Sequence, residues 1–309
     1  MGKRFIGIDF GGTFIKGGLV DENGNIIVLD SVPTLAEEGP DAVIGRIAGL
    51  IEKLSQGVSV CGIGLGIPGL IDSERGEVVT SNNIRWTNVN IVAALKKRFS
   101  CPIKITNDAN AAALGEGRFG AGKKYKTSVF ITIGTGVGGG VIIDGKIYAG
   151  NKSAGAEIGH MIIRPNGEQC TCGSKGCYET YASATALVRE TKKAIADHPD
   201  CLMAKVPSEE ICGKTAFEYA DSDPVAKKVL DEFFENLAIG VTNIANILRP
   251  EAIIFGGGMS KEGERLTAPV KEYLKKHIYA GELGPDVEII CSTLKNAGVC
   301  GAAALNMGE

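Results

Sequence analysis

The sequence lacks a strong excess of charge of either sign. Its 33 lysine and arginine residues nearly balance 36 aspartate and glutamate residues, so the formal net charge over 309 residues is −3. Proteins that hold nucleic acid or an anionic membrane by their overall field carry a basic excess. We therefore expect neither nucleic acid nor a membrane among the partners of this chain.

The sequence also lacks an apolar run long enough to cross a bilayer, and we expect no signal peptide. Its first residues, MGKRFIGID, pass almost directly into a predicted strand. The nine cysteines are an odd number, and most of those outside one cluster lie in or beside apolar runs, as Cys61 and Cys291 do. Thiols in such runs are typical of reduced, buried side chains, so a cytoplasmic location fits best.

Two common nucleotide-binding fingerprints are missing or out of place. No Gly-x4-Gly-Lys followed by Ser or Thr occurs, which excludes a P-loop enzyme. The pattern Gly-x-Gly-x-x-Gly occurs at Gly64 and again at Gly134, but it must open a helix to bind a dinucleotide. The first copy contains Pro68, and the second continues into the strand-like GVIID. A Rossmann-type oxidoreductase is therefore disfavoured.

Glycine is abundant, and it marks a pattern that occurs twice. Each copy has a strand, a Gly/Thr turn, a second strand, an Asn-Gly or Asp-Gly hairpin turn and a third strand. The two Gly/Thr turns are Gly11-Gly12-Thr13 and Gly134-Thr135-Gly136. Glycine-rich hairpins can be alike by chance, but the repetition predicts a duplicated α/β domain.

The Gly/Thr turns are suited to phosphate, because their backbone N–H groups and threonine hydroxyl can meet phosphate oxygens. Asp9 beside the first turn would repel a bare phosphate, so we expect Mg²⁺ between them, held by Asp9 through water. Lys16 could add a cation. The alternatives are that Asp9 caps a turn and that Lys16 is solvated. A third glycine turn, suited to a nucleoside, follows the strand AIIF at Gly256, Gly257 and Gly258.

Between these turns the pattern alternates helix and strand, as α/β proteins do. Helical spacing covers residues 43–54 and 107–119, and VCGIGLGIPG and PIKIT read as strands. A long apolar helix begins at Pro224 and ends before Pro250. A chain of this length suggests two domains, with a boundary near residues 119–126.

Residues 156–180, AEIGHMIIRPNGEQCTCGSKGCYET, hold the densest group of reactive side chains. They contain one imidazole and three thiols, the ligand set of a closed, structural, tetrahedral zinc site. A catalytic zinc would keep an open position. Ordinary buried thiols are the alternative. The predicted zinc ligands are His160, Cys170, Cys172 and Cys177.

Four motifs occur together: Asp9-x-Gly11-Gly12-Thr13, GTGVGGG, Glu157-x-Gly159-His160 and C-x-C-G-x-x-G-C-x-E. In this combination the chain resembles the ROK family of sugar kinases over essentially its whole length, and GCYETYASATAL looks like the bacterial ROK glucokinases. The resemblance implies the actin-like α/β fold of sugar kinases and heat-shock chaperone ATPases, with two duplicated domains around a central cleft. It further implies ATP as phosphoryl donor, Mg²⁺, structural Zn²⁺ and a homodimer.

In such folds the last helix packs on the first domain. We therefore expect a smaller N-terminal domain of residues 1–118 and 297–309, and a larger domain of residues 119–296 with the zinc loop and the nucleotide site. ROK repressors carry an additional N-terminal helix-turn-helix, for which we see no room before the first strand. An enzyme is therefore expected rather than a regulator.

The resemblance also implies roles for single residues. Asp108, which by its position could equally be a helix N-cap, matches the catalytic base that takes the proton of a sugar hydroxyl. Asn107 adjoins it. Asn83 matches the Asn of a family P-N-[Leu/Ile]-x-W segment, in which Asn82 here replaces the usual Pro. The further sugar ligands are Glu157, His160 and Glu179.

These residues predict ATP-dependent phosphorylation of a hexose, with glucose 6-phosphate as the expected product. A kinase for another hexose or for N-acetylmannosamine or N-acetylglucosamine is the nearest alternative. A sugar-sensing regulator without turnover is a second alternative. A zinc-ribbon nucleic-acid module is disfavoured by the acidic balance of the chain.

Overall fold

A computed structural model of the chain describes residues 2–308, which divide into two compact units. The first unit comprises the chain up to Phe130, residues 140–156 and the segment from Thr293 onward. The second unit comprises residues 131–139 and 157–292. Each unit is therefore built from segments that are separate in the sequence.

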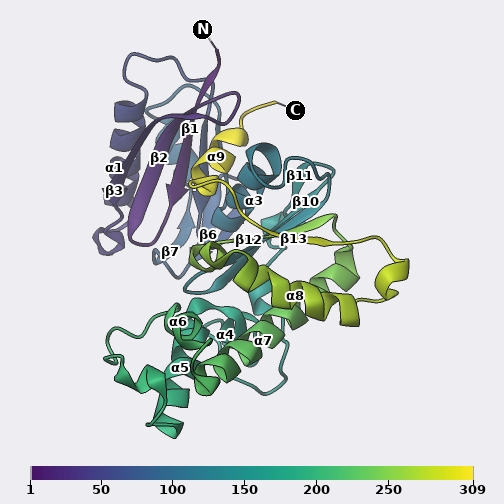
Figure 1. Cartoon of the computed structure of the whole chain (residues 1–309). Helices are drawn as coiled ribbons and strands as arrows, with labels where there is room; N and C mark the ends of the chain where they lie inside the picture. The colour runs from purple at the N-terminus through teal and green to yellow at the C-terminus, as the bar shows by residue number, and fades with distance from the viewer. Residues whose placement is uncertain (1, 309) are drawn as a thin grey trace. The chain divides into compact units, whose positions relative to one another are not determined.

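The first unit is centred on a five-stranded sheet with the order β3-β2-β1-β4-β8 (Figure 1). The pairs β1–β2 and β2–β3 are antiparallel, while β4 pairs in parallel with both β1 and β8. The predicted strands of this region are confirmed. The bounds are β1 Arg4–Phe10, β2 Phe14–Asp21, β3 Ile26–Pro33, β4 Ile63–Ile67 and β8 Ile103–Asn107.

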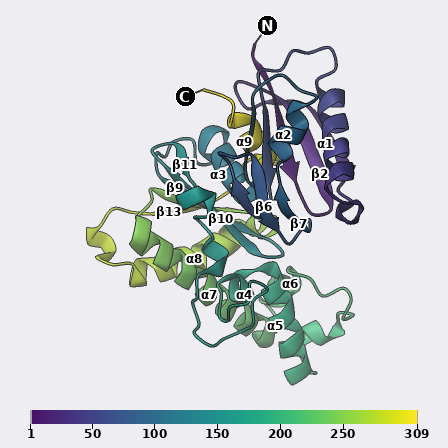
Figure 2. The ribbon, with the colours of Figure 1, turned by 180° about the vertical axis from the view of Figure 1, so that it is seen from behind.

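Helices cover both faces of this sheet, with α1 and α9 on opposite sides in both views (Figures 1 and 2). The apolar stripe of α1 packs with α2 on one face, and α9 packs with α3 on the other. Pro40 stands at the start of α1, where a missing N–H costs nothing. The helices are α1 Pro40–Leu54, α2 Ile91–Lys96, α3 Asp108–Phe119 and α9 Ala297–Ala304.

Glycine allows α9 to approach its neighbours at backbone distance. An added Cβ would lie 2.0 Å from a carbonyl oxygen of α9 at Gly7 and 1.8 Å from one at Gly64. At Gly301, within α9, it would lie 1.6 Å from the carbonyl oxygen of Ala111 in α3. No side chain fits at these three positions, so the contact depends on glycine.

A three-stranded antiparallel sheet, β5-β6-β7, also belongs to the first unit and was not predicted from the sequence. Trp86 of β7 is buried and meets Phe10 of β1 edge to face, with ring centroids 5.3 Å apart. This contact ties the small sheet to the main one. The strands are β5 Leu70–Asp72, β6 Glu77–Ser81 and β7 Trp86–Val89.

The second five-stranded sheet repeats the topology of the first, with the order β11-β10-β9-β12-β13. In each sheet three successive strands form a meander, and two later strands extend it beyond the first strand of that meander. The predicted duplication is confirmed. The strands are β9 Ser128–Ile133, β10 Val137–Ile143, β11 Lys146–Tyr148, β12 Ala252–Gly256 and β13 Glu288–Cys291.

The second unit contains a group of helices dominated by α7, whose predicted limits are confirmed. Asp223 caps its first turn by accepting from the Val225 N–H at 2.9 Å, and Pro224 follows the cap. The last helical residue is Leu248, and Arg249 is the C-cap, just before Pro250. The helices are α4 Glu179–Ala182, α5 Ala184–Asp197, α6 Thr215–Tyr219, α7 Pro224–Leu248 and α8 Glu264–His277.

Short 3₁₀ segments connect several of these elements in both units. They are η1 Ala36–Glu38, η2 Asn151–Ser153, η3 Ile158–His160, η4 Leu202–Lys205, η5 Gly258–Glu262 and η6 Gly281–Leu283.

The cysteines outside the cluster are less uniformly buried than their sequence context predicts. Cys61 is exposed, because it lies in a bend ahead of β4 rather than within the buried strand. Cys291 is partly buried at the end of β13. In residues 2–308 no helix combines the length and apolarity that a membrane span needs.

Candidate functional site

Two carboxylates lie near each other in the first unit, at the ends of parallel strands. Asp9 stands near the end of β1, opposite Gly66 of β4, and Asp108 begins α3 directly after β8. An added Cβ on Gly66 would lie 3.4 Å from the Cα of Asp108, so only a glycine backbone separates the two acidic positions. Ligands of α/β proteins commonly bind at this carboxyl edge of the sheet.

The start of α3 shows which residue caps the helix. The side chain of Asn107 accepts hydrogen bonds from the backbone N–H groups of Ala109 at 2.9 Å and Asn110 at 3.4 Å. Asn107 is therefore the N-cap, and Asp108 is the first helical residue. The Oδ1 of Asp108 accepts from the Ala109 N–H at 2.9 Å.

Burial controls the electrostatics of both acids. It raises the pKa of Asp108, and hydrogen bonds, chiefly from the Ala109 backbone, offset only part of that effect. Burial also raises the pKa of Asp9, to which the charge of Asp108 adds, while Lys16 acts in the opposite direction. Lys16 lies directly opposite Asp9 in the β1–β2 register. The first unit thus brings two carboxylates and one cation together.

The turn Gly11-Gly12-Thr13 joins β1 to β2 beside this acidic pair, and two hydrogen bonds from Thr34 hold it. The buried Thr34 donates its hydroxyl to the Gly11 carbonyl at 2.7 Å and its N–H to the Thr13 carbonyl at 2.9 Å. Gly12 and Thr13 remain exposed. Asn83, exposed in the β6–β7 loop, lies near this turn, because a Cβ on Gly12 would be 3.7 Å from its carbonyl oxygen.

The second unit places two glycine turns side by side. Gly134-Thr135-Gly136 joins β9 to β10, and the Gly134 N–H donates to the Gly136 carbonyl at 3.0 Å. Gly257, with φ of 80°, follows β12 and is packed so closely that a Cβ would lie 2.5 Å from the Ile133 carbonyl oxygen. Gly256 ends β12 and Gly258 begins η5. Exposed backbone at both turns could meet a nucleotide.

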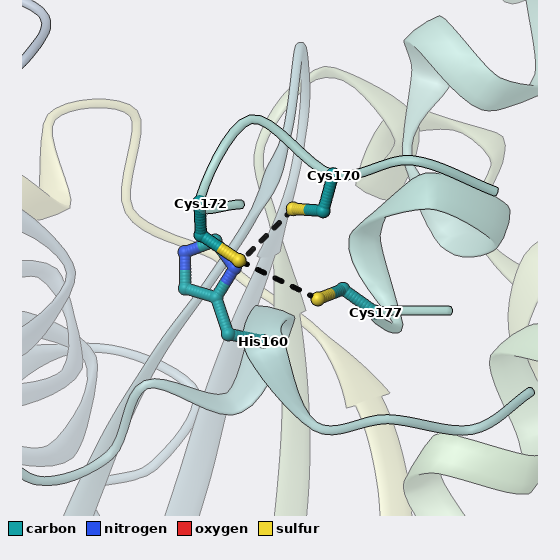
Figure 3. A group of neighbouring side chains, drawn as sticks. All are labelled: His160, Cys170, Cys172 and Cys177. Carbon is teal, nitrogen blue, oxygen red and sulfur yellow. Dashed lines mark hydrogen bonds between the residues drawn. The ribbon is translucent and has the colours of Figure 1, made fainter. Parts of the chain in front are cut away.

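The predicted metal ligands converge in the second unit (Figure 3). The Nδ1 of His160 lies 3.6 Å from the Sγ of Cys170, and the Sγ atoms of Cys172 and Cys177 are 3.6 Å apart. A backbone hydrogen bond from Ser174 lowers the pKa of Cys172 to about 7, whereas burial raises the pKa of Cys170 and that of Cys177.

These distances fit a zinc ion. Zn–S bonds of about 2.3 Å at a tetrahedral centre place two sulfur ligands about 3.8 Å apart. All four ligand atoms lie within 4.8 Å of one another, so a small inward movement would complete the coordination shell. Three sulfurs and one nitrogen leave no open position, which suits a structural metal rather than a catalytic one.

Glu157 and Glu179, the two predicted carboxylate ligands of the sugar, differ in their surroundings. Glu157 is exposed at the start of η3. Glu179 is largely buried, with 20% of its side chain exposed, and its Oε1 lies 3.9 Å from the Nδ1 of His160. Its Oε2 accepts from the Val137 N–H at 3.4 Å. Glu179 therefore lies beside His160 and the other residues of the metal cluster.

Comparison with known proteins decides the family. The model of the ROK family matches residues 5–309, almost the whole chain. The chain belongs to the ROK family.

Relatives of the chain include both kinases and repressors. The chain is 39% identical to a glucokinase of Thermotoga maritima over 98% of its own length and 96% of the relative. It is 34% identical to a xylose repressor of Bacillus spizizenii, with 97% of this chain and 76% of that protein covered. A ROK family glucokinase from Streptomyces griseus, solved with glucose and AMPPNP, aligns with a TM-score of 0.84 at 36% identity, and the match covers 98% of both chains. The predicted actin-like α/β fold is confirmed.

Three glycines at this site were not predicted from the sequence. Gly69, with φ of 110°, accepts a hydrogen bond on its carbonyl from the Asn107 side chain at 3.2 Å. Gly66 separates the acidic positions, and a Cβ on Gly298 of α9 would lie 2.8 Å from the Asp9 carboxyl carbon. Gly66 and Gly69 belong to the glycine pattern that was rejected as a dinucleotide fingerprint. Their role at the site becomes visible only from the residues that they contact in the folded chain.

Proposed function

We propose that the protein phosphorylates glucose to glucose 6-phosphate at the expense of ATP. The observation that carries this proposal is the partly buried Asp108 carboxylate at the carboxyl edge of the first sheet, in a chain so similar to glucokinases. Phosphoryl transfer to an alcohol needs a base near the hydroxyl, positioned phosphates and neutralised charge. The chain offers residues for each of these tasks.

Asp108 is the proposed base. Its carboxylate takes the proton of the attacking hydroxyl as the oxygen bonds to phosphorus, and the raised pKa makes it a better proton acceptor than an exposed aspartate. Since Asn107 caps α3, the base can change protonation without loss of the cap. Asn83, Asn107, Glu157, His160 and Glu179 are the proposed ligands of the sugar hydroxyls.

The nucleotide is proposed to bind at the glycine turns. Backbone N–H groups and hydroxyls of the two Gly/Thr turns would hold phosphate oxygens, Lys16 would add a cation, and Gly256, Gly257 and Gly258 would lie against the nucleoside. Asp9 would hold Mg²⁺ through water, and that ion would neutralise phosphate charge. The remaining parts of the proposal are a structural zinc on His160, Cys170, Cys172 and Cys177, a homodimer and a cytoplasmic location.

Within this proposal the domains are residues 1–118 with 297–309 and residues 119–296. The support for joining the last segment to the first is the backbone contact of α9 with β1 and β4.

A coupled assay of ADP release tests the substrate. Glucose should give the highest kcat/KM in a panel that includes mannose, fructose, N-acetylmannosamine and N-acetylglucosamine. A higher kcat/KM for an acetylated sugar would replace glucose as the substrate. Absence of ADP release with every sugar, together with measurable sugar binding, would indicate a regulator instead.

Asp108→Asn tests the base. General-base catalysis contributes about 10²- to 10⁴-fold, so kcat should fall by at least ~100-fold while the dissociation constant for glucose stays close to that of the wild type. The equivalent loss of transition-state stabilisation is about 3–5 kcal/mol. Near-normal turnover in this variant would remove Asp108 from the role.

A further inference from the structure

Glu179 contacts two parts of the second unit that the proposed function treats separately. Its Oε1 accepts a hydrogen bond from the thiol of Cys170 at 3.3 Å, and its Oε2 accepts one from the backbone N–H of Val137 at 3.4 Å. Cys170 is a proposed metal ligand, and Val137 directly follows the turn Gly134-Thr135-Gly136. One carboxylate therefore spans the metal cluster and a phosphate-facing turn.

The turn is held at both of its ends by the segment that carries Glu179. The N–H of Ala184, the first residue of α5, donates to the Gly134 carbonyl at 2.9 Å. At the other end, an added Cβ on Gly136 would lie 2.5 Å from the Oε2 of Glu179. Glycine at position 136 thus leaves room for the carboxylate, and any side chain there would displace it.

The backbone beneath Glu179 is fixed independently of these contacts. Tyr178 is fully buried, and its hydroxyl donates to the Leu237 carbonyl of α7 at 2.8 Å. Gly240 of α7 packs against the Tyr178 ring, where a Cβ would lie 2.3 Å from ring carbons. Because the backbone is anchored, the partners of Glu179 determine how its carboxylate is oriented.

We propose that Glu179 is a positioning residue that couples occupancy of the metal site to the conformation of the Gly134–Gly136 turn. A bound metal holds the Cys170 sulfur at one position, and the Glu179 carboxylate lies between that sulfur and the Val137 N–H. Metal binding therefore restricts where the carboxylate can lie and holds the turn in one conformation.

Coupling of this kind is reciprocal. If the loaded metal site orders the turn, a nucleotide that binds the ordered turn must raise the affinity for metal by the same factor. This inference rests on the proposed zinc ligands and the proposed phosphate role of the turn, but not on which sugar is phosphorylated.

Zinc affinity of two alanine variants tests the contact without any catalytic readout. The dissociation constant for Zn²⁺ is measured by chelator competition in the absence of sugar and nucleotide. Gly136→Ala should weaken zinc binding by about 10- to 100-fold, as loss of a partner of a metal ligand does. Gly134→Ala is the matched control, since its Cβ would meet nothing within 4 Å, and neither glycine has a positive φ. It should bind zinc like the wild type.

A second measurement tests the linkage itself. The wild-type protein should bind AMPPNP at least about fivefold more weakly after zinc is removed, a factor within the usual range of coupling between sites. Glu179→Ala should lose most of this difference, because the shortened side chain no longer reaches from Cys170 to the Val137 N–H.

The two ways of failing are distinguishable. If the wild type binds no zinc, both the metal assignment and the coupling are wrong. If it binds zinc but Gly136→Ala matches Gly134→Ala, or if AMPPNP affinity is independent of zinc, the coupling alone is overturned and the proposed function stands.

Discussion

At the scale of single residues, the proposed site holds two carboxyl groups in buried surroundings that disfavour their ionised forms. Asp108 and Asp9 both have a pKa above the ordinary value, first because they are buried, and Asp9 also because Asp108 is near. A buried carboxyl group with a raised pKa lowers the stability of the fold, because ionising it in the folded state costs free energy. Its position is therefore explained by chemistry rather than by stability. The capping residue beside it, Asn107, carries the structural task.

We expect Asp108→Asn to stabilise the protein at neutral pH, by about 0.5–2 kcal/mol, the usual range for single stabilising substitutions. The sign follows from linkage. A carboxyl whose folded pKa is raised costs stability above that pKa, and the cost disappears as pH falls below the unfolded value. The gain should therefore be present in urea unfolding at pH 7 to 8 and vanish towards pH 4.

Asp21→Asn is the control with the opposite sign. The slight burial of Asp21 acts to raise its pKa, but hydrogen bonds from Asn25 and Asn23 prevail and lower it. Asp21 therefore stabilises the fold above its unfolded pKa, and the variant should lose stability at pH 7. A loss of stability in Asp108→Asn of the same kind would contradict the account of the site.

At the scale of elements, local patterns predicted what local chemistry determines. The apolar stripe and the proline start of α7 were readable, and so were the two strand–turn–strand hairpins. The strands β5 to β7 were not predicted because they are short. The contact of Trp86 with Phe10, which packs them on the main sheet, joins residues that are distant in the sequence. For the site, motifs indicated Asp108 and the metal cluster, but Gly66 and Gly298 gain meaning only from neighbours distant in sequence.

The cysteine cluster should matter to stability as an element. Cys172→Ser, or removal of metal by a chelator, should lower the free energy of unfolding by at least about 2 kcal/mol, because the binding energy of a structural zinc is folding energy. It should also weaken glucose binding through the loss of a fixed His160. Calorimetric unfolding and glucose titration measure the two effects.

Cys212→Ser is the matched control, because Cys212 is an exposed cysteine of the same unit and lies outside the cluster. Its thermal midpoint should equal that of the wild type. Equal behaviour of the two serine variants would mean that the cluster holds no stabilising metal.

The packing of the Tyr178 ring against α7 can be tested with two glycine-to-alanine substitutions. Alanine in place of glycine stabilises an exposed helix position by about 1 kcal/mol, which is expected for Gly49→Ala in α1, where a Cβ meets nothing within 4 Å. Gly240→Ala should instead destabilise by about 1–3 kcal/mol, because its methyl group would overlap the Tyr178 ring. Urea unfolding compares them, and a stabilised Gly240→Ala would show that the ring is not held there.

At the scale of the whole molecule, the duplication could be predicted from the sequence. Which segments belong to which compact unit could not. Each five-stranded sheet has the same order of strands, which the repeated Gly/Thr hairpins already indicated. The assignment of residues 140–156 and of the segment after Thr293 to the first unit depends on contacts with distant residues. Sequence periodicity has no information about such contacts.

Close packing of α9 against α3 should make the glycine between them intolerant of change. Gly301→Ala would place a methyl group against the Ala111 carbonyl, which is backbone and cannot rotate away. We expect a loss of at least about 1–3 kcal/mol in the free energy of unfolding, the usual cost of overpacking. A variant as stable as the wild type would contradict the observed helix spacing.

The divided first unit has a consequence for synthesis on the ribosome. Residues up to 130 emerge well before α9, and at about 5–20 residues per second the delay is roughly ten to thirty seconds. Throughout that interval the glycine-lined face that will receive α9, at Gly7, Gly64 and Gly115, has no permanent cover. The nascent chain is then open to chaperones and to self-association, and its first-made sheet is completed only by one of its last-made helices.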